Sequence, residues 1–265
     1  MKIIMLVLIS FTLLFSKVYY SKVEPYELRN ISSNVSGLVL FIDEESIGKK
    51  LLSKAYIKID SKLNIAELNA IKDKLIYLRE TVISNEKVLK NLENSLLKKR
   101  KNYKQIESLN IKSRLEKDRE FYELINSENL YLNTKKEINN LKIQITDLKF
   151  RVVQLQRTIN DKNLKNRGFI LYSILVKPGQ VVGVSTPLAQ VADISSAKLT
   201  IYLDSEDLKD AQKKIVYING VKSSYKISRI LSISDSKNIS KYKVQIIIDS
   251  PEVFSKLVKI ELKNE

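Results

Sequence analysis

A seven-residue repeat of apolar side chains runs through the middle of the chain. One position of the repeat holds Leu68, Leu75, Val82, Leu89, Leu96 and Tyr103, and a second position three residues later holds Ile71, Leu78, Asn85, Leu92, Lys99 and Ile106. The repeat resumes with Leu124, Tyr131, Ile138, Ile145, Val152 and Ile159, accompanied by Ser127, Thr134, Leu141, Leu148 and Leu155. Two such seams are typical of coiled coils and predict two helices of about 45 residues each.

The two seams do not join into one continuous helix. The repeat is lost between Ile106 and Phe121, where residues 107–114 (ESLNIKSR) offer Ser and Asn for a turn. We therefore predict an antiparallel hairpin over residues 63–162, with its tip at about 107–114, because this arrangement lets the seams bury each other. A parallel dimer of long helices is the alternative. It is less favoured, since Asn85 and Lys99 would then face their own copies.

Short apolar and alternating runs flank the predicted hairpin on both sides. They are residues 34–43 and 55–60 before it, and residues 168–182 and 186–193 after it. Each side reads as strand, turn and strand, and neither is large enough to bury a core alone. The two sides should therefore pack on each other as one β-sandwich, formed by residues 23–62 and 163–196 and split by the hairpin.

The remainder of the chain again has the pattern of β-structure. Val, Ile and Tyr alternate with Lys and Ser over residues 198–204, 214–220, 224–234, 241–249 and 257–263, and residues 206–211 could form a short helix. Strands with one solvated face in so short a stretch are typical of a small closed sheet. Residues 197–265 are therefore predicted to form a β-barrel.

The N-terminus has the pattern of an export signal. Lys2 precedes an apolar run over residues 3–16, about the length of a signal-peptide core. No cleavage site of two small residues is evident, so we favour an uncleaved signal-anchor over residues 1–22, with Val18, Tyr19 and Tyr20 continuing its helix into the membrane interface. A cleaved signal peptide is the alternative. Either one places the rest of the chain outside the cytoplasm.

Composition excludes several classes of chemistry. The chain has no Cys and no His, and its two methionines both lie in the leader, so imidazole-dependent triads and metal sites of His, Cys or Met are excluded. No catalytic, cofactor-binding or metal-binding residue is predicted, and we expect no enzyme activity. The 46 Lys and Arg against 30 Asp and Glu give a net charge of +16, but the cations are spread along the chain and mixed with acids. This distribution indicates a solvated surface and not a nucleic-acid site.

The order of these parts resembles the hemolysin-D-like (HlyD-like) membrane fusion proteins, the periplasmic adaptor subunits of tripartite efflux and secretion systems. The most specific stretch is Gly168–Leu208, which includes the Pro178-Gly179-Gln180 turn. The resemblance implies an α+β multidomain fold: a coiled-coil hairpin inserted in a lipoyl-like β-sandwich (barrel-sandwich hybrid), then a small β-barrel. The residues expected to determine this fold are Gly37, Gly168, Pro178, Gly179, Pro187 and Asp193.

Two features depart from the family pattern. The first half of the sandwich usually carries a Gly-rich turn like that of the second half, whereas here only Gly48 is present. Little or nothing is left after the barrel for the membrane-proximal domain of many pump adaptors. The class of transporter partner therefore stays open among ABC, RND and major-facilitator proteins.

The resemblance also implies partners. An adaptor would link an inner-membrane transporter to an outer-membrane channel, would be anchored in the inner membrane and exposed to the periplasm, and would form a homo-oligomer, a hexamer in the family. In related adaptors an Arg, a Leu and a Ser near the hairpin tip contact the channel. With the Ser aligned on Ser113, Ile106 takes the Leu position and Asn102 the Arg position. Candidate contact residues at the tip are Arg100, Lys101, Asn102, Ile106, Leu109, Ile111 and Ser113.

Two other function classes remain open at this point. A carrier domain for biotin or lipoate would need a modifiable Lys at a tight β-turn, where this chain has about a hundred residues of coiled-coil pattern. A basic coiled-coil protein that binds nucleic acid would account for the net charge. Cell fractionation separates these alternatives from the adaptor, because only the adaptor should be membrane-bound and accessible to external protease.

Overall fold

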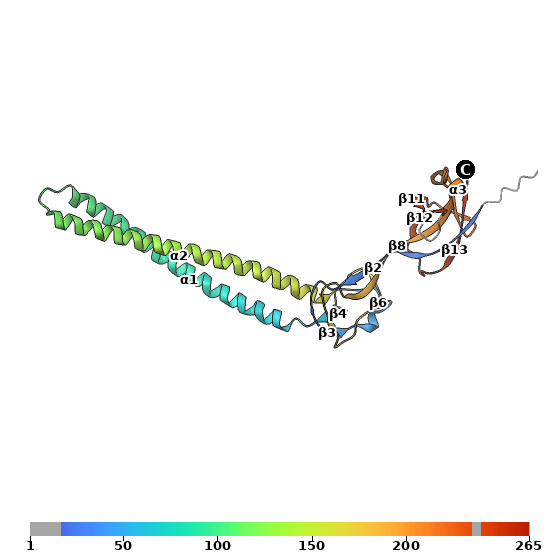
Figure 1. Cartoon of the computed structure of the whole chain (residues 1–265), viewed down its shortest axis with the longest axis horizontal. Coiled ribbons are helices and arrows are strands. Elements are labelled where there is room, and N and C mark those ends of the chain that lie inside the picture. Colours follow the sequence, from blue (N-terminus) through green and yellow to red (C-terminus); the bar gives the residue numbers. More distant parts are fainter. Residues whose placement is uncertain (1–16, 235–239, 265) are drawn as a thin grey trace, which may run out of the picture.

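The protein consists of three parts arranged in a line: a long helical hairpin, a β-sandwich and a β-barrel (Figure 1). The computed structural model describes residues 17–234 and 240–264. The predicted fold class is confirmed, since the hairpin is inserted between two halves of the sandwich and the barrel follows.

The hairpin is formed by α1 (Lys62–Glu107) and α2 (Arg114–Asp161), which have 46 and 48 residues. The helices run antiparallel, so each part of one seam meets the seam of the other (Figure 1). The buried side chains of the hairpin all come from the predicted seam positions: Leu68, Leu75, Val82, Leu96, Ile138, Ile145 and Leu155. At 1.5 Å per residue the arm extends about 70 Å from the sandwich.

Asn85 is a polar residue in this apolar seam. Its Nδ2 atom is buried and has no hydrogen-bond partner among the described residues. A buried amide without a partner costs about 1–3 kcal/mol, so we expect Asn85→Leu to raise the free energy of unfolding of the hairpin by about 1 kcal/mol or more. Urea unfolding followed by far-ultraviolet circular dichroism measures this change. An unchanged midpoint would contradict the prediction.

The sandwich has two sheets that share one core. The first sheet has the order β5-β4-β3-β7 and comprises β5 (Asn163–Leu164), β4 (Ile57–Ile59), β3 (Gly37–Ile42) and β7 (Val181–Val182). The second comprises β2 (Glu24–Ser32), β6 (Ile170–Ile174) and the first part of β8 (Pro187–Asp204). A 3-10 turn, η1 (Glu44–Ser46), lies between β3 and β4. The core between the sheets contains Val39, Tyr56, Ile57, Ile59, Leu171, Val176, Val182, Leu188 and Val191.

The two halves of the sandwich pack on each other, as predicted, and backbone hydrogen bonds join them. Gly37 pairs with Val182 in the β3–β7 ladder. The backbone N–H of Val39 donates to the carbonyl of Gln180 at 2.9 Å, and the N–H of Gly179 donates back to the carbonyl of Val39 at 2.8 Å. Segments that are about 140 residues apart in sequence therefore form one sheet.

A second junction replaces the Gly-rich turn that the first half lacks. The N–H of Gly48 donates to the carbonyl of Leu171 at 2.8 Å, and the N–H of Leu51 donates to the carbonyl of Phe169 at 2.7 Å. Gly48 has a φ of +79°, in the left-handed region. The single glycine thus allows the segment after β3 to turn and lie along β6.

The Pro178-Gly179 turn has the predicted geometry. Gly179 has a φ of +85°, and the N–H of Gln180 donates to the carbonyl of Lys177 at 3.1 Å, which closes a four-residue turn. Gly168 also has a positive φ, +94°, just before β6. Pro187 is the first residue of β8, where its missing N–H costs little.

Asp193 organises a bulge inside β8. Its Oδ1 accepts a hydrogen bond from the N–H of Ser195 at 2.9 Å, which holds the pKa of Asp193 below its usual range, with Arg29 adding to the effect. The pairing of β2 with β8 skips from Glu27–Asp193 to Pro25–Ala197 at this point. Asp193, which the family resemblance marks as a fold-determining residue, thus lies where β8 leaves the sandwich.

β8 is one strand of 18 residues, whereas the sequence pattern predicts two separate strands. Its first part pairs with β2 and β6 in the sandwich, and its second part pairs with β12 in the barrel. No glycine or proline occurs from Leu188 to Leu203, and the bulge absorbs the change of partner without ending the strand.

The barrel is built from two sheets that pack on one core, and the second part of β8 belongs to one of them. Its other strands are β1 (Val18–Lys22), β9 (Ile215–Ile218), β10 (Val221–Lys222), β11 (Ile227–Ser234), β12 (Lys241–Asp249) and β13 (Leu257–Lys263). Its core includes Leu199, Ile201, Leu203, Val216, Val244, Ile246 and Ile260. The helix predicted at 206–211 is shorter: α3 covers Ser205–Leu208, and a 3-10 turn, η2 (Ala211–Lys213), follows Asp210, whose φ of +56° interrupts the helix.

The N-terminal prediction needs a correction. Residues 18–22 were expected to continue a membrane anchor, but they form β1, which pairs antiparallel with β13. Val18, Tyr19 and Tyr20 are β-branched or aromatic, and strands favour both types. The anchor expected over residues 1–16 lies outside the described residues. Within residues 17–234 and 240–264, no helix has both the length and the apolar content needed to cross a membrane.

Candidate docking site at the hairpin tip

The hairpin tip is a six-residue turn, residues 108–113, that is held closed by local hydrogen bonds. The N–H of Leu109 donates to the carbonyl of Ile106 at 3.2 Å, and the hydroxyl of Ser108 donates to the carbonyl of Gln105 at 2.8 Å. From the other helix, Lys117 Nζ donates to the carbonyl of Glu107 at 2.9 Å. These donors satisfy carbonyls at the end of α1, where helices otherwise leave acceptors without partners.

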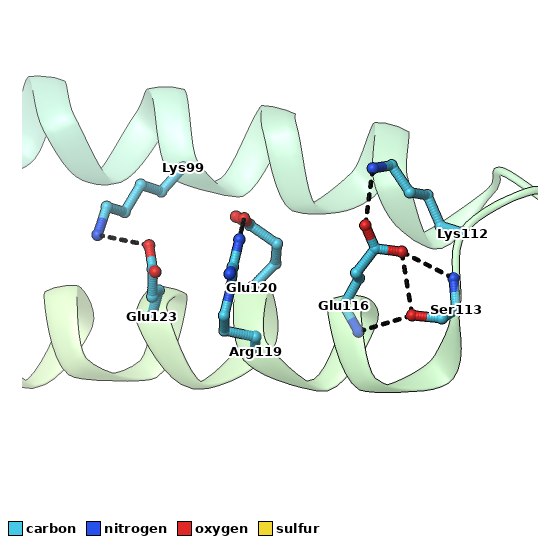
Figure 2. Close-up of polar contacts among 7 residues, drawn as sticks. All are labelled: Lys99, Lys112, Ser113, Glu116, Arg119, Glu120 and Glu123. Atoms are coloured by element: carbon cyan, nitrogen blue, oxygen red, sulfur yellow. Dashed lines mark hydrogen bonds and ion pairs between the residues drawn. The ribbon is translucent and has the colours of Figure 1, made fainter.

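Ser113 begins α2 through a capping box (Figure 2). The N–H of Glu116 donates to Ser113 Oγ at 3.3 Å, and Glu116 Oε2 accepts from the N–H of Ser113 at 3.0 Å. Lys112 Nζ lies 3.0 Å from Glu116 Oε1. The backbone N–H of Ser113, the ammonium of Lys112 and the hydroxyl of Ser113 lower the pKa of Glu116 from 4.5 to about 2. Ser113 therefore starts a helix in this chain.

This capping box should be sensitive to pH. The folded-state pKa of Glu116 lies below its unfolded value, so its contribution to stability is present above pH 4.5 and is lost as the pH falls towards 2. We expect Glu116→Gln to reduce the hydrogen-exchange protection of the first turn of α2 at pH 6, and to have little effect near pH 2. Ser113→Ala should weaken the same turn by about 1 kcal/mol. Equal effects of Glu116→Gln at both pH values would contradict the assignment.

Apolar side chains project from the tip into solvent. Ile111 is 88% exposed and Leu115 is 80% exposed, and Leu109 is exposed as well. Ile106, in the last turn of α1, is half-buried. Leu109 and Ile111, two of the candidate contact residues, are thus accessible at the tip. Large apolar groups exposed at the free end of an arm make the tip a candidate surface for contact with another molecule.

The basic run on α1 lies below the tip. Arg100 forms an ion pair with Glu128 of α2, and Lys99 Nζ lies 3.8 Å from Glu123. Lys101 and Asn102 are exposed. The structure does not bring Arg100 and Asn102 together with the apolar residues of the turn, because about two helical turns separate them along α1. Their place on the helix is that of a solvated face.

Sequence reasoning missed several residues of the tip. Leu115, Phe121 and Tyr122 are exposed, and the rings of Tyr103, Phe121 and Tyr122 contact one another in series at centroid distances of 5.7 and 5.9 Å. The capping box itself was readable as Ser113-Arg114-Leu115-Glu116, which fits the pattern Ser-x-x-Glu. This pattern predicts that α2 starts at residue 114 and that Leu115, in its first turn, is exposed.

The surface of the tip is basic and has an apolar centre. Residues 98–123 contain nine Lys and Arg and five Asp and Glu, many of them in ion pairs on the helix surface. The described residues contain no group of Asp or Glu that could hold a metal ion. A basic surface with an apolar centre is complementary to an apolar, acidic protein surface.

No protein-family model matches the sequence, and no curated protein matches it significantly. Solved structures do match. MacA from Actinobacillus actinomycetemcomitans aligns with a TM-score of 0.70 at 18% sequence identity, over 93% of this chain and 78% of MacA. A membrane fusion protein of Streptococcus pneumoniae aligns with a TM-score of 0.54 at 12% identity, over 94% of this chain and all of that protein. The chain has the membrane fusion protein fold.

A third similar structure contains a helical hairpin from a different protein. It is a MacA–MexA chimera that contains the α-hairpin domain of Pseudomonas aeruginosa MexA, and it aligns with a TM-score of 0.57 at 15% identity, over 94% of this chain and 81% of the chimera. Identities of 12–18% establish the shared fold. What this chain contacts at its tip has to be argued from its own residues.

Proposed function

We propose that this protein is a periplasmic adaptor that links an inner-membrane transporter to an outer-membrane channel during efflux or secretion. The observation that carries the proposal is the exposed apolar tip, Leu109, Ile111 and Leu115, at the free end of an arm about 70 Å long. An arm of this length with an apolar end is suited to reach a partner at a distance. The membrane fusion protein fold supports the same role.

In this proposal the two ends of the molecule have different partners. The apolar run over residues 3–16 anchors the chain in the inner membrane beside the transporter, which can be of the ABC, RND or major-facilitator class. The tip contacts the channel. Several copies, six as in the family that the chain resembles, surround the path of the exported substrate, and the transporter supplies the energy. The protein acts by contact and conformational coupling, without catalysis and without binding nucleic acid.

A carrier role for lipoate or biotin has less support. In the split sandwich, the segment between β4 and β5 is the entire α-helical hairpin, so the position of a modifiable Lys at a tight β-turn is taken by the arm.

Charged substitutions at the tip test the proposal. Burial of a large apolar side chain contributes about 1.5 kcal/mol or more, so Ile111→Asp combined with Leu115→Asp should lower the affinity for the channel by at least about a hundredfold. In a deletion strain, this variant should fail to restore export or resistance, although its amount in the membrane is unchanged. The readout is the accumulation of fluorescent efflux substrates together with growth inhibition by a panel of toxic compounds.

Leu52→Asp is the matched control, because Leu52 is 71% exposed but lies in a loop of the sandwich, far from the tip. It should restore export as the unaltered chain does. Full restoration by the tip variant would refute the docking role of the tip.

A further inference from the structure

A cleft lies between the sandwich and the barrel, on one side of the ribbon formed by β2 and β8. Its volume is about 410 Å³, within the range of about 300–1,000 Å³ that is usual for small-molecule sites. Residues of both domains line it, since Leu28 and Tyr172 come from strands of the sandwich and Phe254 comes from the loop between β12 and β13. The cleft is far from the hairpin tip and plays no part in the proposed docking.

The floor of the cleft is an apolar row across three adjacent strands. Leu28 on β2, Ala192 on β8 and Ile170 on β6 are direct partners in the two ladders, so their side chains stand on the same face of the sheet. Val191, the neighbour of Ala192, belongs to the sandwich core on the opposite face. The outer face of such a sheet normally carries polar residues. Here Leu28 is 50% exposed and Tyr172 is 60% exposed, so an apolar surface is left open.

The mouth of the cleft is positively charged. Lys22 and Lys198 line it together with one acid, Glu24, which is the cross-strand partner of Lys198. Neither lysine forms an ion pair among the residues that the structure describes; Lys198 Nζ donates to the carbonyl of Tyr26 at 3.2 Å. The lining of the cleft thus carries two cations and one carboxylate. Lys198 also attracts the carboxylate of Glu27, so Lys22 is the cation available to a ligand beside the apolar floor. An anionic group at this mouth would gain an attraction that an apolar or cationic group would not.

We propose that this cleft binds a single-chain amphiphile that carries a carboxylate head group, of the fatty-acid type. The apolar chain lies on Leu28, Ile170 and Tyr172 and is covered from the other side by Phe254. The carboxylate accepts hydrogen bonds from Lys22 at the mouth. Because the ligand contacts both domains, its binding should also hold the barrel against the sandwich. This proposal does not depend on the adaptor function.

The chain contains no tryptophan, which allows a local test of binding. Tyr172→Trp places a single fluorescent reporter in the cleft, and Tyr77→Trp places one at a similarly exposed position on α1, with side chains 60% and 68% exposed before substitution. Each full-length variant is reconstituted in lipid nanodiscs and titrated with ω-bromoundecanoate, whose bromine quenches tryptophan only on contact. We expect saturable quenching of the reporter in the cleft. The reporter on α1 should show only weak quenching that rises linearly.

Charge selectivity is tested in the Tyr172→Trp background. Lys22→Gln should raise the half-saturating concentration of the bromo acid by about fivefold, the loss expected for one charge-assisted contact. Lys222→Gln, on the exposed strand β10, should leave it unchanged. A bromoundecyl trimethylammonium ion should quench without saturation. If Tyr172→Trp does not fold, Phe254→Trp on the opposite wall of the cleft replaces it as the reporter.

The outcomes separate the parts of the proposal. Saturable quenching that Lys22→Gln weakens and Lys222→Gln does not supports an anionic amphiphile site. Equal, linear quenching of both reporters shows that the acid only partitions into lipid, and overturns the site. Saturation by the cationic probe at the same concentration overturns the assignment of an anionic ligand.

Discussion

Gly37→Ala should lower the free energy of unfolding of the sandwich by about 1–3 kcal/mol, whereas Gly183→Ala should leave it unchanged or slightly raised. A Cβ atom at residue 37 would lie 2.6 Å from Cγ2 of Ile59, a side chain that is 1% exposed. At residue 183 a Cβ would meet no atom within 4 Å. Hydrogen exchange of the β3 and β4 amides measures the change, because both strands contribute to the affected contact.

A double-mutant cycle with Ile59→Leu identifies the cause of this effect. Leucine lacks the branch at Cβ that carries the Cγ2 methyl, so it removes the atom that the new methyl group would strike. The two substitutions together should cost less than the sum of their separate effects, by about 1 kcal/mol. Strict additivity would show that the cost at residue 37 has another origin.

Leu155→Ala should destabilise the hairpin by about 2–5 kcal/mol, the range for removing a leucine from a packed core. Leu155 is 1% exposed, the lowest value among the buried residues of the two helices, and it lies near the base where α2 meets the sandwich. Far-ultraviolet circular dichroism during urea unfolding follows this change, since the two long helices dominate the helical signal.

Val153→Ala is the control for Leu155→Ala. Val153 is 64% exposed on the same helix, two residues away, so its truncation should change stability by less than about 0.5 kcal/mol. Similar shifts for the two variants would contradict the view that the seam holds the hairpin together.

The sequence predicted the hairpin well because its signal is strong and local. Leu68, Leu75 and Leu96 repeat at a fixed spacing, and helix burial depends directly on that spacing. The union of the two half-sheets was also predictable, since neither half could bury Val39 or Val182 alone. In both cases the need to bury apolar surface leaves few arrangements to choose from.

Strand boundaries were less predictable because they depend on distant partners. The residues around Asp193 do not by themselves indicate that β8 continues from one domain into the next. The strand continues because its first part pairs with β2 in the sandwich and its second part pairs with β12 in the barrel. The assignment of Val18–Lys22 to β1 depends similarly on pairing with β13, more than 230 residues away. Short apolar runs fit a strand or the end of a membrane helix equally well, and a tertiary contact decides between them.

The position of the candidate docking site could be predicted from the sequence, but only some of its residues could. The break in the seam placed the tip, and the exposure of Leu109 and Ile111 followed from their position at the turn. The family alignment points to Ser113 as a contact residue, and that contact stays a prediction. The local pattern with Glu116 additionally specifies a helix cap at Ser113. An alignment by position does not distinguish a hydroxyl that binds a partner from one that already has its hydrogen bonds filled.

The continuous strand β8 has a mechanical consequence for the molecule. A flexible linker would let the arm and the barrel turn independently, but a hydrogen-bonded strand resists twisting about its own axis. Torque applied to the arm should therefore pass through the sandwich and rotate the barrel with it. The arm, the sandwich and the barrel would then rotate together as one rigid unit, so a movement imposed on the hairpin would change the orientation of the barrel.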